Sequence, residues 1–250
     1  MSDLLRALGL LTILPANPQW DERTAPGRAM AWYPLAGALI GSIVAAVAFG
    51  LDRSGMWDRA PLVSAALTLA AWVILTGALH LDGWADCCDA LFVPVERARR
   101  LEIMKDPRLG SFGAVGLVLL ILVKLGALSE AASNPAIIVL TPALARWALV
   151  VAAAAFPLAK QEGMAFFFRR SLGRREILIA TATATLLLAL SWPWGGAHLL
   201  VLPLVAAMAM AAVSGLATRR LGGLTGDVYG AIIELSETAA LLAALFVVRN

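Results

Sequence analysis

Three aspartates with helical spacing are the residues of this sequence best suited to chemistry. Asp82, Asp86 and Asp89 lie in the run HLDGWADCCD, which begins at His80. On a helix they would fall at about 0°, 40° and −20°, and so on one face. Like charges at this spacing repel one another. A divalent cation is the natural partner, and Mg²⁺ fits because it takes oxygen ligands and commonly bridges carboxylates to substrate phosphates.

The spacing leaves the arrangement of the metal open. Asp82 and Asp89 are too far apart along a helix to bind one ion tightly, so the neighbouring pairs are better ligand sets. Two ions, or one ion beside a carboxylate acting as general base, both remain open. His80 is a second candidate for the base or a phosphate contact, or else a hydrogen-bonded structural histidine. The alternative for the aspartates is a solvated helix start favoured by the helix dipole.

A second cluster follows between Arg97 and Gly113. Glu102 and Asp106 are separated by one helical turn, and Lys105 and Arg108 stand beside them. A basic loop near an acidic metal site suits a diphosphate substrate, because cations hold phosphates while the metal stabilises developing charge. We therefore expect Lys105 and Arg108 to bind phosphate. The alternative is a basic loop that serves membrane topology alone.

A third cluster begins in the glycine-rich run GGLTGD, which ends at Asp227. Glycine lets the backbone approach a ligand closely, and a helix that starts here could offer N–H groups to an anion. We expect Gly223 and Thr225 to contact phosphate and Asp227 to join the metal ligands. Glu234 and Glu237 follow within an apolar stretch, where ionisable groups are costly. They are further site candidates, or interfacial residues if that stretch is shorter.

Two basic residues lie inside apolar stretches. We expect Arg146 to contact a phosphate or pair with a carboxylate, since an interior Arg usually does one or the other. Lys124 either pairs with a carboxylate inside the bundle or extends between helices.

The elements that position these residues are membrane helices. The chain of 250 residues is 60% hydrophobic and only 15% charged, whereas soluble domains are about 25% charged. We expect an all-α, polytopic membrane protein in which residues 1–250 form one domain. Stretches near the length of about 20 residues needed to cross a bilayer predict about seven spans. They are Ala31 to Gly50, Ala60 to His80, Ser111 to Leu128, Ala136 to Leu158, Ile177 to Trp192, Ala197 to Ala217 and Val228 to Val248.

Basic residues outside these spans predict the orientation, because Lys and Arg are retained in cytoplasmic loops. One side would hold most of them, including Arg23. The other side would hold Arg53, Arg59 and Arg249 alone. The N-terminus, the long loops and the candidate site are therefore predicted to be cytoplasmic. Leu4 to Leu14 is expected to be an interfacial helix rather than a signal peptide.

The remaining composition excludes some classes of function. The net charge of +3 comes from blocks of basic residues between spans, which indicates topology rather than a nucleic-acid partner. Cys87 and Cys88 are adjacent and form no zinc or disulfide pattern.

The three clusters, in this order, resemble the cobalamin synthase family of adenosylcobinamide-GDP ribazoletransferases. HLDGWADCCDALF is similar to that family's HLDG-x-AD-x-x-D signature. The segments ERARRLEIMKDPRLGSFG, GGLTGDVYGAIIELSE and Arg28 to Gly37 resemble its other motifs. Departures at Cys87, Cys88, Ala90 and Pro107 remove no carboxylate.

The resemblance implies a membrane transferase in the late steps of cobalamin biosynthesis. It would transfer the adenosylcobinamide phosphate moiety of adenosylcobinamide-GDP to α-ribazole, or to α-ribazole 5′-phosphate. The products would be GMP and adenosylcobalamin, or its 5′-phosphate. It also implies Mg²⁺ and an inner-membrane location.

Two other classes stay open at this point. One is a Mg²⁺-dependent membrane phosphotransferase that acts on a lipid diphosphate. The other is a cation-coupled transporter, although transporters usually show paired broken helices or repeat symmetry. The sequence is compatible with a homo-oligomer and with a monomer.

Overall fold

The chain folds into a bundle of helices. The computed structural model describes residues 3–16, 25–131 and 134–247. Within these residues all named elements are helical, and one isolated parallel bridge joins Leu158 to Leu224. The predicted all-α class is therefore confirmed. Arg23, Arg249 and the predicted end of the last span at Val248 lie outside the described residues.

The described chain contains long helices and shorter ones that precede or connect them. The long ones are α2 (Tyr33–Arg53), α4 (Pro61–Thr76), α7 (Ser111–Ala131), α8 (Pro135–Ala155), α10 (Arg174–Leu190), α11 (Val201–Leu221) and α12 (Gly226–Val247). The shorter ones are α1 (Asp3–Leu11), η1 (Pro26–Trp32), α3 (Met56–Arg59), α5 (Leu79–Leu91), α6 (Arg97–Ile103), α9 (Gly163–Arg169), η2 (Trp192–Trp194) and η3 (Gly196–Leu200).

Five helical segments of the described residues are long and apolar enough to cross a membrane, or six if α4 and α5 count as one bent span. This agrees with a polytopic membrane protein, but the predicted count of seven is not confirmed. Most of the segment predicted as Ile177 to Trp192 lies in α10, whose 17 residues are fewer than those of any of the five segments. The five segments are Pro26–Arg53, Ser111–Glu130, Pro135–Ala155, Gly196–Leu221 and Gly226–Phe246.

The predicted second span is wrong as one straight helix. α4 ends at Thr76, and α5 leaves it at an angle of 90°. Gly77 and Ala78 adopt left-handed backbone conformations. Their N–H groups bond back to the carbonyls of Ile74 and Val73, the pattern of a Schellman motif that ends a helix. The apolar composition continues through this break, which is why hydropathy missed it.

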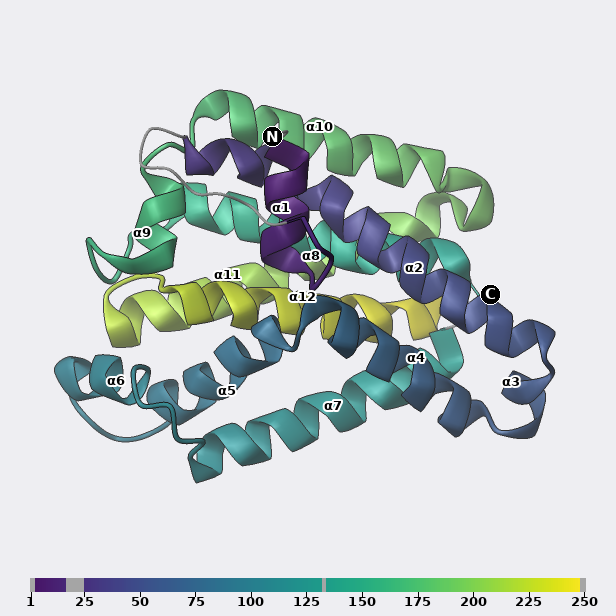
Figure 1. Ribbon diagram of the computed structural model, residues 1–250, viewed down its shortest axis with the longest axis horizontal. Coiled ribbons are helices and arrows are strands. Elements are labelled where there is room, and N and C mark those ends of the chain that lie inside the picture. The colour runs from purple at the N-terminus through teal and green to yellow at the C-terminus, as the bar shows by residue number, and fades with distance from the viewer. Residues whose placement is uncertain (1–2, 17–24, 132–133, 248–250) are drawn as a thin grey trace.

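Figure 1 shows the long helices running between two ends of the bundle. α6, α9 and the turn between α11 and α12 gather at one end, and α3 lies at the other. α12 packs against α5, α7, α8 and α11. The basic loops therefore share one end, and the cytoplasmic location of that end stays a prediction. The interfacial placement of the N-terminal segment also stays a prediction, although its helix, α1, is present.

Candidate active site

The acidic segment forms helix α5, as its spacing predicted. Asp82 is exposed, Asp86 is half-buried and Asp89 is buried. The end of α5 is held by Arg100, whose buried guanidinium donates to the carbonyls of Ala90 at 2.5 Å and Leu91 at 3.0 Å. Such donors satisfy the carbonyls that a helix C-terminus leaves without partners. Arg100 thus fixes the helix on which the aspartates stand.

Asp89 differs from the other two aspartates because its carboxylate binds backbone. Its two oxygens accept hydrogen bonds from the N–H groups of Gly110 and Gly113, each at 2.8 Å. These groups lie at the start of α7 and have no partner within that helix. Asp89 therefore ties α5 to α7. A side chain at either glycine would collide with this carboxylate.

Asp227 is brought to α5 by contact between two helices. A Cβ atom added to Gly83 of α5 would lie 2.7 Å from the carbonyl oxygen of Asp227. One added to Gly230 of α12 would lie 3.1 Å from the carbonyl oxygen of His80. Small residues at both positions let the backbones approach closely. The structure thus places the first turn of α12 against the first turns of α5.

The charges of these aspartates act on one another. Asp86 lies within electrostatic range of Asp227, Asp82 and Asp89, with Asp227 the strongest. Asp227 in turn lies within range of Asp82. Within the described residues, none of Asp82, Asp86 and Asp227 forms an ion pair with Lys or Arg. The repulsion among them is therefore not relieved by a salt bridge.

The glycine-rich turn before α12 holds two loops together. Gly222 ends α11 in a left-handed conformation. The N–H of Leu224 donates to the carbonyl of Pro157 at 2.8 Å, and Ala159 donates to Leu224 at 2.9 Å. Gly223 is buried against this neighbouring backbone. Its close approach is to the protein chain, whereas Thr225 lines a cavity.

That cavity is polar and has a volume of about 340 Å³. Lys105, Lys160, Glu162, Thr225 and Asp227 contribute its polar side chains. Lys105 lies 3.7 Å from the carboxylate of Glu162, and both side chains are exposed. The arrangement brings two ammonium groups and a carboxylate of the acidic cluster to one space, which suits a diphosphate with a metal ion.

Lys160 was missed by sequence reasoning, which counted it only as a topology charge. Its position follows from the bridge between Leu158 and Leu224, which sets the residues after Leu158 beside Thr225. Burial, and then the nearby charge of Lys105, lower the pKa of Lys160 below its ordinary value. No spacing in the sequence signals this contact, because the two loops lie far apart along the chain.

Two ion pairs within the predicted basic loop lie at the surface. Arg99 bonds to Glu102 at 2.8 Å, and Arg108 bonds to Asp106 at 2.6 Å. The hydrogen bonds from Arg108 lower the pKa of Asp106 to about 2. Glu102, Asp106 and Arg108 do not line the polar cavity, and they do not line a second, apolar cavity next to it.

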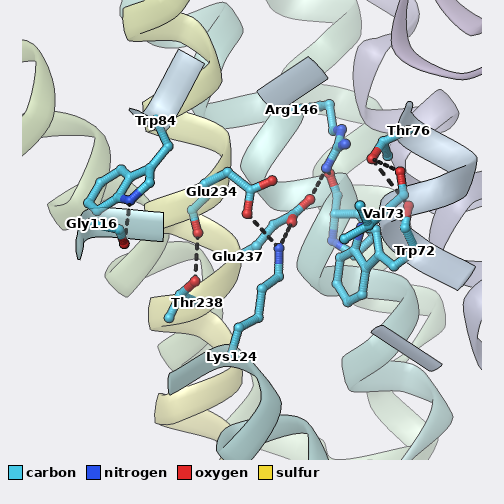
Figure 2. A network of polar contacts seen from close by, with 11 residues as sticks. Trp72, Val73, Thr76, Trp84, Gly116, Lys124, Arg146, Glu234, Glu237 and Thr238 are labelled. Atoms are coloured by element: carbon cyan, nitrogen blue, oxygen red, sulfur yellow. Dashed lines mark hydrogen bonds and ion pairs between the residues drawn. The ribbon is translucent and has the colours of Figure 1, made fainter. Parts of the chain in front are cut away.

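Glu234 and Glu237 line neither cavity and belong to a buried ion cluster (Figure 2). Lys124 donates to Glu234 at 2.8 Å and to Glu237 at 2.5 Å. Arg146, which is fully buried, pairs with Glu237. The ammonium of Lys124 also lies 4.7 Å from the centre of the Trp72 ring. Of the alternatives for Lys124 and Arg146, the structure shows pairing with carboxylates.

His80 and Asp82 line a second, apolar cavity of about 200 Å³. Met164, Ala165, Gly226 and Asp227 border both cavities. The two spaces are therefore neighbours, with Asp227 at their common boundary.

In the described part of the chain, no three His, Cys, Asp or Glu side chains are arranged as a ready metal cage. Mg²⁺ usually needs only one or two protein carboxylates, because waters and substrate phosphates complete its coordination. Asp227 lines the polar cavity and Asp82 lines the apolar one, and Asp86 lies within electrostatic range of both. Among the described residues, none of these three carboxylates forms an ion pair. This donor set suits Mg²⁺ bound together with a phosphate substrate.

Comparison with known families gives this arrangement a context. The profile of a family described as cobalamin-5-phosphate synthase matches residues 3–245. The chain belongs to this family. Each of the four segments that resemble cobalamin synthase motifs contributes residues to one of the two cavities or to both. Residues of α1, α8, α9 and the loop before α9 also line the cavities.

Relatives in this family match over nearly their whole length. A protein of Pseudomonas paraeruginosa is 40% identical, with 97% of each chain covered. One from Stutzerimonas stutzeri is 39% identical, also with 97% of each covered. A third, from Desulforamulus reducens, is 33% identical over 98% of this chain and 96% of its own. All three are named adenosylcobinamide-GDP ribazoletransferase. No solved structure matches the chain.

Proposed function

We propose that this protein transfers the adenosylcobinamide phosphate moiety of adenosylcobinamide-GDP to α-ribazole or α-ribazole 5′-phosphate. GMP is released, and adenosylcobalamin or its 5′-phosphate is formed. Membership of the family and the shared name of the relatives support this activity. The observation that carries the proposal is the position of Asp227, which lines a cavity together with Lys105 and Lys160. Asp227 also lies within electrostatic range of Asp86 and Asp82, with no ion pair among the described residues. The family and its relatives do not support the alternatives of a lipid-diphosphate transferase or a transporter.

The reaction is a phosphoryl transfer that this site could accelerate by position and charge. A ribose hydroxyl of the acceptor attacks the phosphorus that carries the cobinamide side. A new O–P bond forms, the bond to the bridging oxygen of the diphosphate breaks, and GMP leaves with that oxygen. A carboxylate of Asp82, Asp86 or Asp227 accepts the hydroxyl proton. Lys105 and Lys160 hold the phosphate oxygens in the polar cavity.

Mg²⁺ is proposed as the cofactor, held by Asp82, Asp86 and Asp227. When bound, it would offset the charge of the diphosphate and of the departing phosphate oxygen. Asp89 is assigned to positioning, because both of its oxygens already accept backbone hydrogen bonds. His80 remains a second candidate for the general base.

The proposed location is the inner membrane, with the N-terminus and the end of the bundle that carries α6 and α9 in the cytoplasm. The excess of Lys and Arg in the loops at that end supports this orientation. The lipid bilayer is then a partner of the helices' exposed apolar side chains.

The test is an assay of the purified protein in nanodiscs with both substrates. We expect release of GMP and formation of the joined product, both dependent on Mg²⁺. Asp82→Asn and Asp227→Asn should each reduce turnover at least about 100-fold, since each removes a carboxylate from the proposed metal site. The matched control is Glu102→Gln, which removes an exposed carboxylate that lines neither cavity. Turnover of either aspartate variant at the control's rate would contradict the assignment.

A further inference from the structure

The apolar cavity is bordered by Asp82 and Asp227, but its apolar wall is not used by the phosphate chemistry proposed above. It lies between α1, the η1–α2 segment, α5, α8, α9 and α12. Leu11, Met30, Leu149 and Phe168 are buried residues of its wall. Apolar cavities of about 150 Å³ bind benzene. At about 200 Å³, this one has room for a somewhat larger flat ring system, but not for a corrin macrocycle.

Two polar groups in this apolar wall have no hydrogen-bond partner among the described residues. They are the Nδ1 atom of His80 and the hydroxyl of Tyr229. Their residues are only 3% and 8% exposed, respectively. Buried polar groups are nearly always hydrogen-bonded, so these two indicate an occupant that offers a polar atom. They point to a mainly apolar ligand with few hydrogen-bonding atoms.

The position of the cavity limits which part of a substrate could enter it. Asp227 lies on the boundary with the polar cavity, where Lys105 and Lys160 stand. A nucleoside whose base filled the apolar cavity would have its ribose at this boundary. Its hydroxyls would then lie beside the carboxylates and next to the phosphate-binding lysines.

We propose that the apolar cavity binds the aromatic base of the acceptor nucleoside, with Tyr229 as a specificity-determining residue. This rests on the proposed function, in which the acceptor is α-ribazole, a riboside of dimethylbenzimidazole. That base is flat and apolar, and it has one free ring nitrogen to accept a hydrogen bond from the Tyr229 hydroxyl. The guanine of the donor substrate has polar atoms along most of its edge, which this wall would leave unpaired.

Two variants test the cavity in different ways. Tyr229→Phe removes only the hydroxyl and should raise KM for α-ribazole about 3- to 10-fold, the usual worth of one neutral hydrogen bond. Leu149→Phe enlarges a wall residue that does not border the polar cavity. It should raise KM for α-ribazole at least about tenfold, but affect a riboside of the smaller imidazole much less. KM for adenosylcobinamide-GDP should stay unchanged in both variants.

The matched control is Thr141→Val. Thr141 also has a buried hydroxyl with no partner in the part of the chain that the structure describes, but it lines neither cavity. This variant should keep the wild-type KM for both substrates. A rise in KM for adenosylcobinamide-GDP, or an equal loss with acceptors of every size, would overturn the proposal.

The test of the base-binding cavity can be separated from the test of the transfer reaction. Turnover by the wild-type protein tests the transfer reaction by itself. If the wild type releases no GMP, calorimetric titration of α-ribazole into wild-type and Leu149→Phe protein still tests the cavity. Binding by the wild type that the variant weakens at least about tenfold supports the subsite, and equal binding, or none, contradicts it.

Discussion

The four aspartates of the site have two different surroundings, and these predict different roles. Asp89 is buried and accepts two backbone hydrogen bonds from the start of α7. Asp82, Asp86 and Asp227 have no ion pair in the described residues and repel one another. The first arrangement stabilises the fold, whereas we propose that the second binds a cation.

Substitution of Asp89 should therefore cost stability. In Asp89→Asn, the amide nitrogen would face a backbone N–H and leave that donor unpaired, at a cost of about 1–3 kcal/mol. We expect a lower melting temperature in detergent. Asp82→Asn is the matched comparison, because Asp82 is exposed and its loss relieves repulsion. An Asp89→Asn protein that melts with the wild type would contradict the positioning role.

Lys160 should give the reaction a dependence on alkaline pH. Its pKa is lowered by burial and by Lys105, so its charge is lost at a lower pH than that of an ordinary lysine. As the pH rises through this value, KM for adenosylcobinamide-GDP should rise, because one phosphate contact weakens. In Lys160→Arg the charge persists, so the rise should move to higher pH. Identical pH profiles for the two proteins would exclude Lys160 from the phosphate site.

Sequence spacing predicted part of this residue pattern. It placed Asp82, Asp86 and Asp89 on one helix, which α5 confirms. It could not separate Asp89 from the others, because the N–H groups that occupy Asp89 belong to Gly110 and Gly113 on another helix. The position of Lys160 was not predicted either, because it depends on a contact between two loops that lie far apart in the sequence.

Among the elements, the contact of α5 with α12 determines whether the site exists. Gly83 and Gly230 let the two helices meet where Asp227 begins α12. From the sequence, we predicted a close backbone approach only for the glycines in the turn before α12. There, Gly223 packs against a neighbouring loop instead of a ligand.

Gly83→Ala should separate the two helices. Its new Cβ would lie 2.7 Å from the Asp227 carbonyl oxygen and 3.0 Å from its Cα, and backbone cannot move as easily as a side chain. We expect turnover to fall at least about tenfold, since a displacement of about 1 Å can cost far more than that. Gly126→Ala is the control, because no other described residue comes within 4 Å of a Cβ there, apart from the glycine's own helix backbone. Wild-type turnover by Gly83→Ala would show that this close approach is not needed.

The bend between α4 and α5 illustrates what hydropathy cannot predict. The apolar sequence runs on from Ala60 to His80, and only the left-handed conformations of Gly77 and Ala78 stop the helix. A hydrogen bond from the Ile13 N–H to the Leu75 carbonyl, at 2.9 Å, then secures the broken end. That contact joins segments far apart in the sequence. The bend turns His80 and Asp82 toward the cavities instead of along a span.

Across the whole molecule, the buried ion cluster joins the helices that surround the site. Lys124 comes from α7, Arg146 from α8, and Glu234 and Glu237 from α12. Two cations balance two carboxylates, so no net charge is buried. We infer that the cluster fixes α12, and with it Asp227, inside the bundle.

This balance can be tested with single and double variants. Lys124→Met leaves Glu234 without its partner and should destabilise the protein by about 3–5 kcal/mol, as expected when a buried pair is broken. Adding Glu234→Gln removes the unpaired charge and leaves Arg146 with Glu237. The double variant should therefore be more stable than Lys124→Met in thermal unfolding in detergent. A double variant that is less stable would contradict the pairing.

We propose that carboxylates of α5 and α12 together hold one divalent cation. The most direct measurement is binding of Mn²⁺ to the purified protein, followed by electron paramagnetic resonance and competed with Mg²⁺. We predict that Asp82→Asn, Asp86→Asn and Asp227→Asn each weaken binding at least about tenfold, because each removes a charged oxygen ligand. Glu102→Gln should bind as the wild type does. Undiminished Mn²⁺ binding by the three aspartate variants would show that these carboxylates do not hold the cation.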